Sequence, residues 1–161
     1  MSNRIGFGFD THRFSDDPSR VLMLGGIQVD DCAGLVGHSD ADCIAHAITD
    51  ALLGAAQLGD MGSHFPDTDP KWKGADSLVM LRAAVDLVWG EGLRVCNVDS
   101  TVVCEKPKIA PHRDLMQKRL STVVGAPVSV KASRAEGMGA LGRVEGIACW
   151  AVAMLSNEGR S

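Results

Sequence analysis

The chain has 161 residues, of which 45% are hydrophobic and 22% are charged. This composition predicts one globular domain over residues 1–161 and excludes a disordered chain. Lys and Arg together number 16 and Asp and Glu number 20, a net charge of −4, so the chain lacks the broad basic surface of a nucleic-acid-binding protein.

The location of the protein is predicted from its apolar segments and its cysteines. No apolar stretch approaches the roughly 20 residues that span a membrane. The first residues resemble neither a signal peptide nor an Arg- and Ser-rich transit segment. The five cysteines are scattered and form no C-x-x-C pair, which is typical of reduced thiols. We therefore expect a cytoplasmic protein that binds neither membranes nor nucleic acid.

The first third of the chain predicts strands followed by a helix. Residues 5–12 alternate apolar residues with polar residues or Gly, the pattern of a strand, and residues 21–29 predict one or two further strands. Ser39 and Asp42 then resemble a capping box at the start of a helix. Apolar residues recur at helical spacing from there to Ala55.

The remainder of the chain predicts, in order, a loop over 60–74, a helix over 76–89, a strand over 93–104, a loop over 105–111, a helix over 111–124, a strand over 128–132, a Gly-rich turn region over 133–142 and a strand over 145–155. The order β-β-α-α-β-α-β-β lacks strict βαβ alternation. It predicts an α/β protein of the α+β type, with a mixed sheet of four to five strands and helices on one face.

A metal site is suggested by Asp10 and His12. Residues i and i+2 of a strand point to the same face, and a carboxylate beside an imidazole offers two good zinc ligands. A solvated strand end explains an isolated Asp-x-His equally simply, so the motif needs a third ligand to become specific.

The predicted helix offers that third ligand as His46. His38, Asp42, His46 and Asp50 follow one another at intervals of four residues, and no Lys, Glu or Arg lies between residues 38 and 58. Such a face is either plain solvent-exposed surface or the wall of a site. If His46 joins Asp10 and His12, three ligands leave a fourth position open, as in catalytic zinc sites. Asp42 and Asp50 would then be candidates to accept the second ring N–H of His46.

Several loop residues have both a purely structural and a functional interpretation. The Asp residues of the loop over 60–74 suit either turns or the binding of a cation or sugar hydroxyl. Lys106 and Lys108 are either solvated or placed to meet a phosphate.

Seven motifs carry a family resemblance: Gly8-Phe9-Asp10-x-His12, Gly37-His38-Ser39-Asp40-x-Asp42, His46-Ala47-x-Thr49-Asp50-Ala51-Leu52-Leu53-Gly54-Ala55, Leu58-Gly59-Asp60-x-Gly62, Phe65-Pro66-Asp67-Thr68-Asp69-Pro70, Pro107-Lys108-x-x-Pro111-His112 and Arg143-x-Glu145-Gly146-Ile147-Ala148. Their order and extent, from residue 5 to residue 155, resemble the 2-C-methyl-D-erythritol 2,4-cyclodiphosphate synthase family.

The resemblance implies a homotrimer in which mixed sheets pack around a threefold axis and active sites lie between subunits. It implies a cyclising phosphorus–oxygen lyase of the non-mevalonate route to isoprenoid precursors. The 2-phosphate of 4-diphosphocytidyl-2-C-methyl-D-erythritol 2-phosphate attacks the β-phosphorus of its own diphosphate, and CMP leaves as the cyclic diphosphate forms.

The resemblance also implies roles for single residues. Zn²⁺ would be held by Asp10, His12 and His46, and a second divalent ion, Mg²⁺ or Mn²⁺, by Glu136. Catalytic contacts with phosphate would come from His38 and Arg134. The substrate would be bound by Asp10, His12, His38, Ser39, Asp60, Met61, Gly62, Phe65, Asp67, Asp69, Cys104, Lys106, Pro107, Lys108, Ala110, Ser133, Glu136 and Arg143. In that set, residues 60–69 would hold the erythritol and residues 104–110 the cytidine.

One departure from the family pattern concerns catalysis, because Arg134 stands where the family usually has a Thr that contacts phosphate. A guanidinium there either supplies a bidentate phosphate contact, crowds the site or points away. Two alternatives to the synthase follow: a non-catalytic trimeric binder of cytidine nucleotides or isoprenoid diphosphates, and a zinc-dependent phosphoester hydrolase.

Overall fold

The computed structural model describes residues 2–30 and 32–157; the outermost ends of the predicted domain, residues 1 and 158–161, lie outside the described residues. A mixed four-stranded sheet forms the framework, with strand order β1-β6-β4-β5. β4 and β5 are parallel, and the other neighbours are antiparallel. The four strands are β1 (Asn3–Arg13), β4 (Arg94–Val103), β5 (Val128–Ser133) and β6 (Gly146–Ser156). A separate hairpin is formed by β2 (Leu22–Leu24) and β3 (Ile27–Val29).

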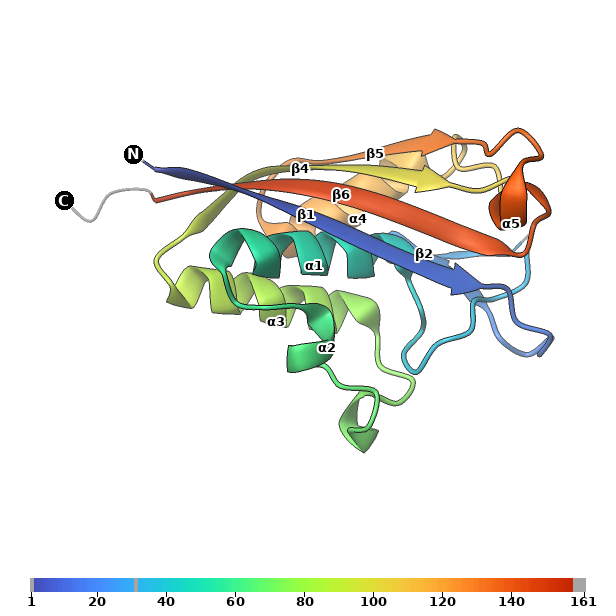
Figure 1. Ribbon diagram of the computed structural model, residues 1–161, viewed down its shortest axis with the longest axis horizontal. Coiled ribbons are helices and arrows are strands. Elements are labelled where there is room, and N and C mark those ends of the chain that lie inside the picture. Colours follow the sequence, from blue (N-terminus) through green and yellow to red (C-terminus); the bar gives the residue numbers. More distant parts are fainter. Residues whose placement is uncertain (1, 31, 158–161) are drawn as a thin grey trace.

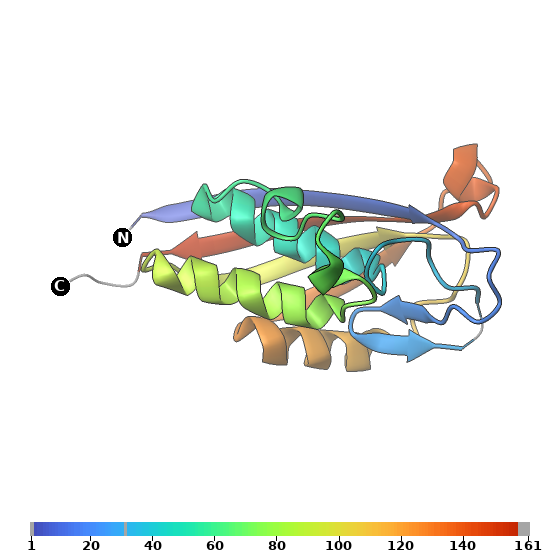
Figure 2. The ribbon, with the colours of Figure 1, turned by 90° about the horizontal axis from the view of Figure 1, so that it is seen from below.

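The three long helices cover one face of the sheet, as Figures 1 and 2 show. They are α1 (Cys43–Ala56), α3 (Ser77–Gly90) and α4 (Arg113–Val124). The predicted mixed sheet with helices on one face is therefore confirmed. The segments predicted as loop and turn also contain short helices: α2 (Met61–His64), the 3₁₀ helix η1 (Pro70–Trp72) and α5 (Gly139–Gly142). None of the helices among the described residues is long and apolar enough to cross a membrane.

Two glycines of β1 allow α1 to lie directly on the sheet. A Cβ added to Gly6 would come within 1.9 Å of the Ala51 carbonyl oxygen, and one added to Gly8 within 2.0 Å of the Ala47 carbonyl oxygen. Any larger residue at these positions would push the helix away. This close approach brings His46, one residue before Ala47, over the next two helix-facing positions of β1, which are Asp10 and His12.

The opposite face of β1 is apolar and uncovered. Ile5, Phe7 and Phe9 are 72%, 61% and 46% exposed, while the even-numbered Gly6 and Gly8 between them are buried. Val152 of β6, the cross-strand partner of Phe7, is also exposed. A contiguous apolar surface of this kind marks an interaction site.

The start of α1 differs from the prediction. The helix begins at Cys43 with Asp42 as its N-cap, and the Asp42 carboxylate accepts from the backbone N–H groups of Ile44 and Ala45. It also accepts from Gly25 N at 2.9 Å and Gly26 N at 2.6 Å, in the turn of the β2–β3 hairpin. The predicted capping box is therefore wrong, because Ser39 lies outside the helix and Asp42 is occupied by four backbone donors.

Candidate functional site

Asp10, His12 and His46 form a compact cluster in the layer between sheet and helix. The Asp10 Oδ2 atom lies 2.9 Å from His12 Nε2 and 3.2 Å from His46 Nδ1. The two ring nitrogens are 3.3 Å apart. The three ligand atoms lie within 4.8 Å of one another, and among the described residues no other group of three His, Cys, Asp or Glu does so. The predicted triad is thus brought together by the fold.

The remaining ring nitrogen of each histidine is engaged by a second partner. His12 Nδ1 lies 2.7 Å from the carbonyl oxygen of Val36, which can only accept a hydrogen bond. In the neutral ring, Nδ1 therefore carries the hydrogen, and Nε2 presents its electron pair to the cluster. His46 Nε2 lies 2.8 Å from Ser77 Oγ and 3.1 Å from Ser39 Oγ.

The prediction that Asp42 or Asp50 accepts the second ring N–H of His46 is therefore wrong. The Asp42 carboxylate is bound to backbone N–H groups, and Asp50 accepts from Met61 N at 3.3 Å.

Charge within the cluster is balanced by hydrogen bonding. Burial would raise the pKa of the Asp10 carboxyl, but hydrogen bonds and charge from His12 and His46 hold that pKa well below its ordinary value. Burial would lower the pKa of His12, yet the hydrogen bond and charge of Asp10 raise it above its ordinary value. Two imidazole nitrogens and one carboxylate oxygen match the donor set of a zinc site with an open position. The residues therefore fit a metal ion that replaces the shared protons.

The segment before α1 is held in place by Arg20. Its guanidinium donates to the carbonyl oxygens of Leu35, Gly37 (3.0 Å) and Ser39 (2.6 Å). These bonds position His38 and Ser39 beside the cluster. The sequence carries no signal for Arg20, because it lies in an irregular polar segment. The groups that it binds are backbone carbonyl oxygens of another loop, and side-chain patterns do not reveal such partners.

The predicted loop over 60–74 reaches His38. His38 Nε2 lies 3.2 Å from the Asp69 carbonyl oxygen, and Gly74 N donates to the His38 carbonyl oxygen at 2.7 Å. The Asp60 side chain caps α2 by accepting from Ser63 N, and the Asp69 side chain caps η1 by accepting from Lys71 N.

The other residues predicted in this loop vary in exposure. Phe65 is buried with its ring edge against Trp72, Gly62 and Asp67 are exposed, and Met61 is half-buried. Asp60 and Asp69 thus cap short helices rather than forming simple turns; their binding to substrate stays a prediction.

A hollow of about 460 Å³ lies beside the segment predicted to seat cytidine. Its lining comes from two neighbouring sheet segments and the start of α4. The lining residues are Cys104, Glu105, Pro107, Lys108, Ile109, Ala110, Arg113, Ala132, Ser133 and Arg134. A second hollow, of about 630 Å³, shares four of these residues and adds Lys106. Neither hollow is lined by Asp10, His12 or His46 of the same chain.

Two lining residues have notable chemistry. Burial raises the pKa of the Cys104 thiol to about 11, so this thiol is protonated at neutral pH and is no nucleophile. The Nε atom of Arg113 is buried without a hydrogen-bond partner among the described residues. Arg113 was not predicted as a site residue, because a single Arg at a helix start carries no specific sequence signal.

Arg134 is held against the cytidine segment. Its Nη2 and Nε atoms lie 2.6 Å and 2.8 Å from Glu105 Oε2, and Gly137 N donates to Glu105 Oε1 at 3.3 Å. The Arg134 guanidinium lowers the pKa of Glu105 by hydrogen bonding and charge. Arg134 thus lines the hollow while its guanidinium is paired with Glu105; its contact with phosphate stays a prediction. Glu136 is exposed, with φ at +53°.

Near the end of the chain, Arg143 pairs with Glu145, as their spacing suggests. The Arg143 Nε atom lies 2.7 Å from Glu145 Oε1. Both side chains are more than half exposed.

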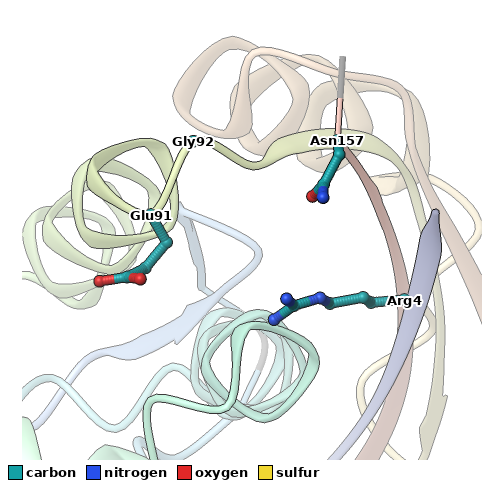
Figure 3. Close-up of a pocket in the computed structure, with 4 residues that line it drawn as sticks. All are labelled: Arg4, Glu91, Gly92 and Asn157. Atoms are coloured by element: carbon teal, nitrogen blue, oxygen red, sulfur yellow. The ribbon is translucent and has the colours of Figure 1, made fainter. Parts of the chain in front are cut away.

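A further hollow, of about 300 Å³, lies at the opposite end of the sheet (Figure 3). Arg4 and Asn157 line one side of it, and Glu91 and Gly92 line the other. Arg4 lies six positions before Asp10 in β1, a distance of roughly 20 Å along an extended strand. This hollow therefore lies away from the metal-ligating cluster.

Comparison with known proteins gives one consistent result. Residues 3–156 match the YgbB family. A 2-C-methyl-D-erythritol 2,4-cyclodiphosphate synthase of Syntrophobacter fumaroxidans is 49% identical over 160 residues, which are 98% of this chain and 99% of that protein. The IspF–CDP complex of Plasmodium falciparum has a TM-score of 0.85 at 33% identity and covers 98% of both chains. The bifunctional IspDF of Campylobacter jejuni has a TM-score of 0.90 at 39% identity; the match covers 96% of this chain and 42% of that longer one.

Proposed function

The chain belongs to the YgbB family, and on this premise we propose that it converts 4-diphosphocytidyl-2-C-methyl-D-erythritol 2-phosphate to 2-C-methyl-D-erythritol 2,4-cyclodiphosphate with release of CMP. This is a step of the non-mevalonate route to isoprenoid precursors, carried out by a cyclising phosphorus–oxygen lyase. The observation that carries the proposal is the assembled Asp10, His12 and His46 cluster in a chain that matches a synthase over nearly its full length.

The reaction needs no nucleophile from the protein. An oxygen of the substrate's 2-phosphate forms a bond to the β-phosphorus, and the bond from that phosphorus to the oxygen bridging it to the α-phosphate breaks, so that CMP leaves with the electron pair. The difficulty is electrostatic, since two anionic groups must meet. Catalysis therefore rests on positioning the phosphates and neutralising their charge.

The metal of the cluster is Zn²⁺ in this proposal, supported by its two-nitrogen, one-oxygen donor set. When bound, it supplies a positive charge that orients and neutralises phosphate oxygens. A second divalent ion, Mg²⁺ or Mn²⁺, would use Glu136, whose single exposed carboxylate suits an ion completed by substrate phosphates.

The side chains of His38 and Ser39 would contact phosphate in the proposed complex. Arg134, fixed by Glu105, would add a charge-assisted contact at the edge of the hollow. Residues 60–69 would enclose the erythritol portion, since their loop is tied to His38.

The cytidine is proposed to occupy the hollow lined by residues 104–110. Its volume of about 460 Å³ lies in the range of small-molecule sites, and the similar IspF of Plasmodium falciparum is described as a CDP complex.

Each complete site is proposed to form between subunits of a homotrimer. Two observations support this: the nucleotide hollow and the metal-ligating cluster do not share lining residues within one chain, and the apolar face of β1 is uncovered.

Cys43, Cys96, Cys104 and Cys149 are free thiols, which suits the reducing cytoplasm as the location.

A test of the function is incubation of the purified protein with the substrate, Zn²⁺ and Mg²⁺, followed by ³¹P NMR of the products. The synthase produces CMP and a cyclic diphosphate in equal amounts. If the protein binds CDP but releases no CMP from the substrate, the non-catalytic binder is supported. Linear phosphorylated products would support the hydrolase. His46→Ala is the control that should abolish turnover.

A further inference from the structure

We propose that Ser77, anchored by Asp40, is a positioning residue that fixes the orientation and tautomer of His46, and that Ser39 is left free to serve the substrate. The inference rests on the metal centre of the proposed function and extends it beyond the three ligands. It starts from the two hydroxyl groups that meet His46 Nε2: Ser77 Oγ at 2.8 Å and Ser39 Oγ at 3.1 Å.

The direction of the Ser77 hydrogen bonds follows from Asp40. The Ser77 hydroxyl donates to Asp40 Oδ1, and Ser77 N donates to Asp40 Oδ2 at 3.1 Å. A hydroxyl has one proton, and Ser77 gives it to a carboxylate, which only accepts. The Ser77 oxygen must therefore accept from His46 Nε2–H. This assigns the imidazole proton to Nε2 and leaves the electron pair of Nδ1 directed at Asp10 and His12.

The anchor is itself rigidly held. Asp40 Oδ1 also accepts from Asp42 N at 3.1 Å, and Asp40 N donates to the Ala75 carbonyl oxygen at 3.0 Å. Ser77 is fully buried as the first residue of α3. The contact between Asp40 and Ser77 thus joins the segment before α1 to the beginning of α3. It orients the His46 ring from its Nε2 side, opposite the nitrogen that faces Asp10 and His12. A carboxylate acting through a partner on a ligating histidine raises the basicity of the ligand and fixes its ring.

Ser39 occupies a different position in the same network. Its oxygen accepts from Ala41 N at 3.1 Å. Since His46 Nε2 donates, it cannot accept a hydrogen bond from the Ser39 hydroxyl, and the other hydroxyl contact, with Ser77 Oγ, is long at 3.5 Å. The Ser39 hydroxyl proton is therefore available to a phosphate oxygen. The two serines beside His46 Nε2 thus have separate roles: Ser77 orients the metal ligand His46, and Ser39 can donate a hydrogen bond to the substrate.

The decisive experiment measures metal affinity without turnover. Zn²⁺ affinity is determined by competition with a chromophoric chelator for wild type, Ser77→Ala, Asp40→Asn and Ser39→Ala. Loss of a partner of a ligating histidine typically weakens metal binding by about 10- to 100-fold, so we expect that range for Ser77→Ala and a smaller loss for Asp40→Asn, which keeps an acceptor but not the charge. Ser39→Ala should bind Zn²⁺ within about threefold of wild type and should raise KM. Equal affinities for wild type and Ser77→Ala would overturn the proposal.

A second measurement needs no variant and covers the case in which Ser77→Ala does not fold. In ¹⁵N NMR of the metal-free wild-type protein at alkaline pH, neutral His46 should carry its proton on Nε2. A proton on Nδ1 would overturn the proposal regardless of any metal. Failure of the wild-type protein to bind Zn²⁺, with the Nε2–H tautomer present, would instead refute the metal centre of the proposed function and leave the positioning of His46 by Ser77 intact.

Discussion

The guanidinium of Arg134 covers the carboxylate of Glu105, with two of its nitrogens within 2.8 Å of one carboxylate oxygen. The Glu105 side chain is 8% exposed beneath an Arg134 side chain that is 66% exposed. The residues follow the parallel neighbours β4 and β5, which end at the same edge of the sheet. An arginine held in this way keeps donors exposed to solvent beside the hollow lined by residues 104–110, where an anionic ligand can meet them.

Arg134→Ala is expected to lower kcat/KM by about 10- to 100-fold, because a hydrogen bond to a charged group contributes roughly 1.5–3 kcal/mol. Arg134→Thr should retain more activity than Arg134→Ala, since a hydroxyl can still donate to phosphate. Steady-state kinetics of CMP release provides the measurement. Lys131→Ala is the matched control, as it breaks another surface ion pair, with Asp99 at 2.6 Å. Unchanged kinetics of Arg134→Ala would mean that the pair with Glu105 is only structural.

Removing the metal should abolish activity reversibly. Dialysis against a chelator is expected to stop CMP release, and addition of Zn²⁺ should restore it. By elemental analysis, Asp10→Asn and His46→Ala should contain little zinc, because each removes one of three ligands. Asp50→Asn, an acidic change on the same helix outside the cluster, should keep its zinc. A zinc content unaffected by His46→Ala would place the metal elsewhere.

In the metal-free protein, the Asp10 and His12 pair should make stability depend on pH. The lowered pKa of Asp10 means that its contribution is fully present above 3.8 and is lost as the pH falls below that value toward its folded pKa. The raised pKa of His12 means that its contribution is fully present below 6.5 and is lost as the pH rises through its folded pKa.

The difference in unfolding free energy between wild type and Asp10→Asn, from urea denaturation, should therefore be largest between pH 3.8 and 6.5. Asp16→Asn, a change at a fully exposed carboxylate, should give a difference that stays near zero across this range. A wild-type advantage that keeps growing above the pKa of His12 would contradict the proposed origin.

Asp42→Ala should lower the free energy of unfolding by about 2–4 kcal/mol. The change leaves buried backbone donors of Gly25 and Gly26 unsatisfied and removes the cap of α1. Asp76→Ala is the control, because it removes the exposed N-cap of α3 and should cost only about 1 kcal/mol. Equal losses for the two variants would show that the bonds to the hairpin add nothing.

The apolar face of β1 is expected to form the subunit interface of the proposed homotrimer. Phe7→Glu places a charge among exposed apolar side chains, so light scattering should report a monomer. Activity should fall as well, because each site is proposed to form between two subunits. Val79→Glu introduces the same charge at a similarly exposed position of α3, on the helical side of the sheet. It should remain trimeric. A trimeric Phe7→Glu would exclude this face as the interface.

The sequence by itself determined the features that depend on local backbone geometry. Strand alternation has a period of two, so the shared face of Asp10 and His12 follows from their spacing alone. The apolar pattern and the helix-stopping residues likewise predicted α1, α3 and α4 to within a few residues. The ordered motifs also indicated the family.

Only the tertiary structure decided which distant groups meet. His46 reaches Asp10 because Gly6 and Gly8 let α1 lie directly on β1, a packing effect that periodicity does not encode. Asp42, and not Ser39, is the N-cap of α1, and its carboxylate also accepts from two backbone donors of the β2–β3 hairpin. The partners Arg20, Asp40 and Ser77 act through hydrogen bonds across long sequence separations. Such bonds depend on where backbone and side-chain atoms lie in space, and no local pattern specifies that.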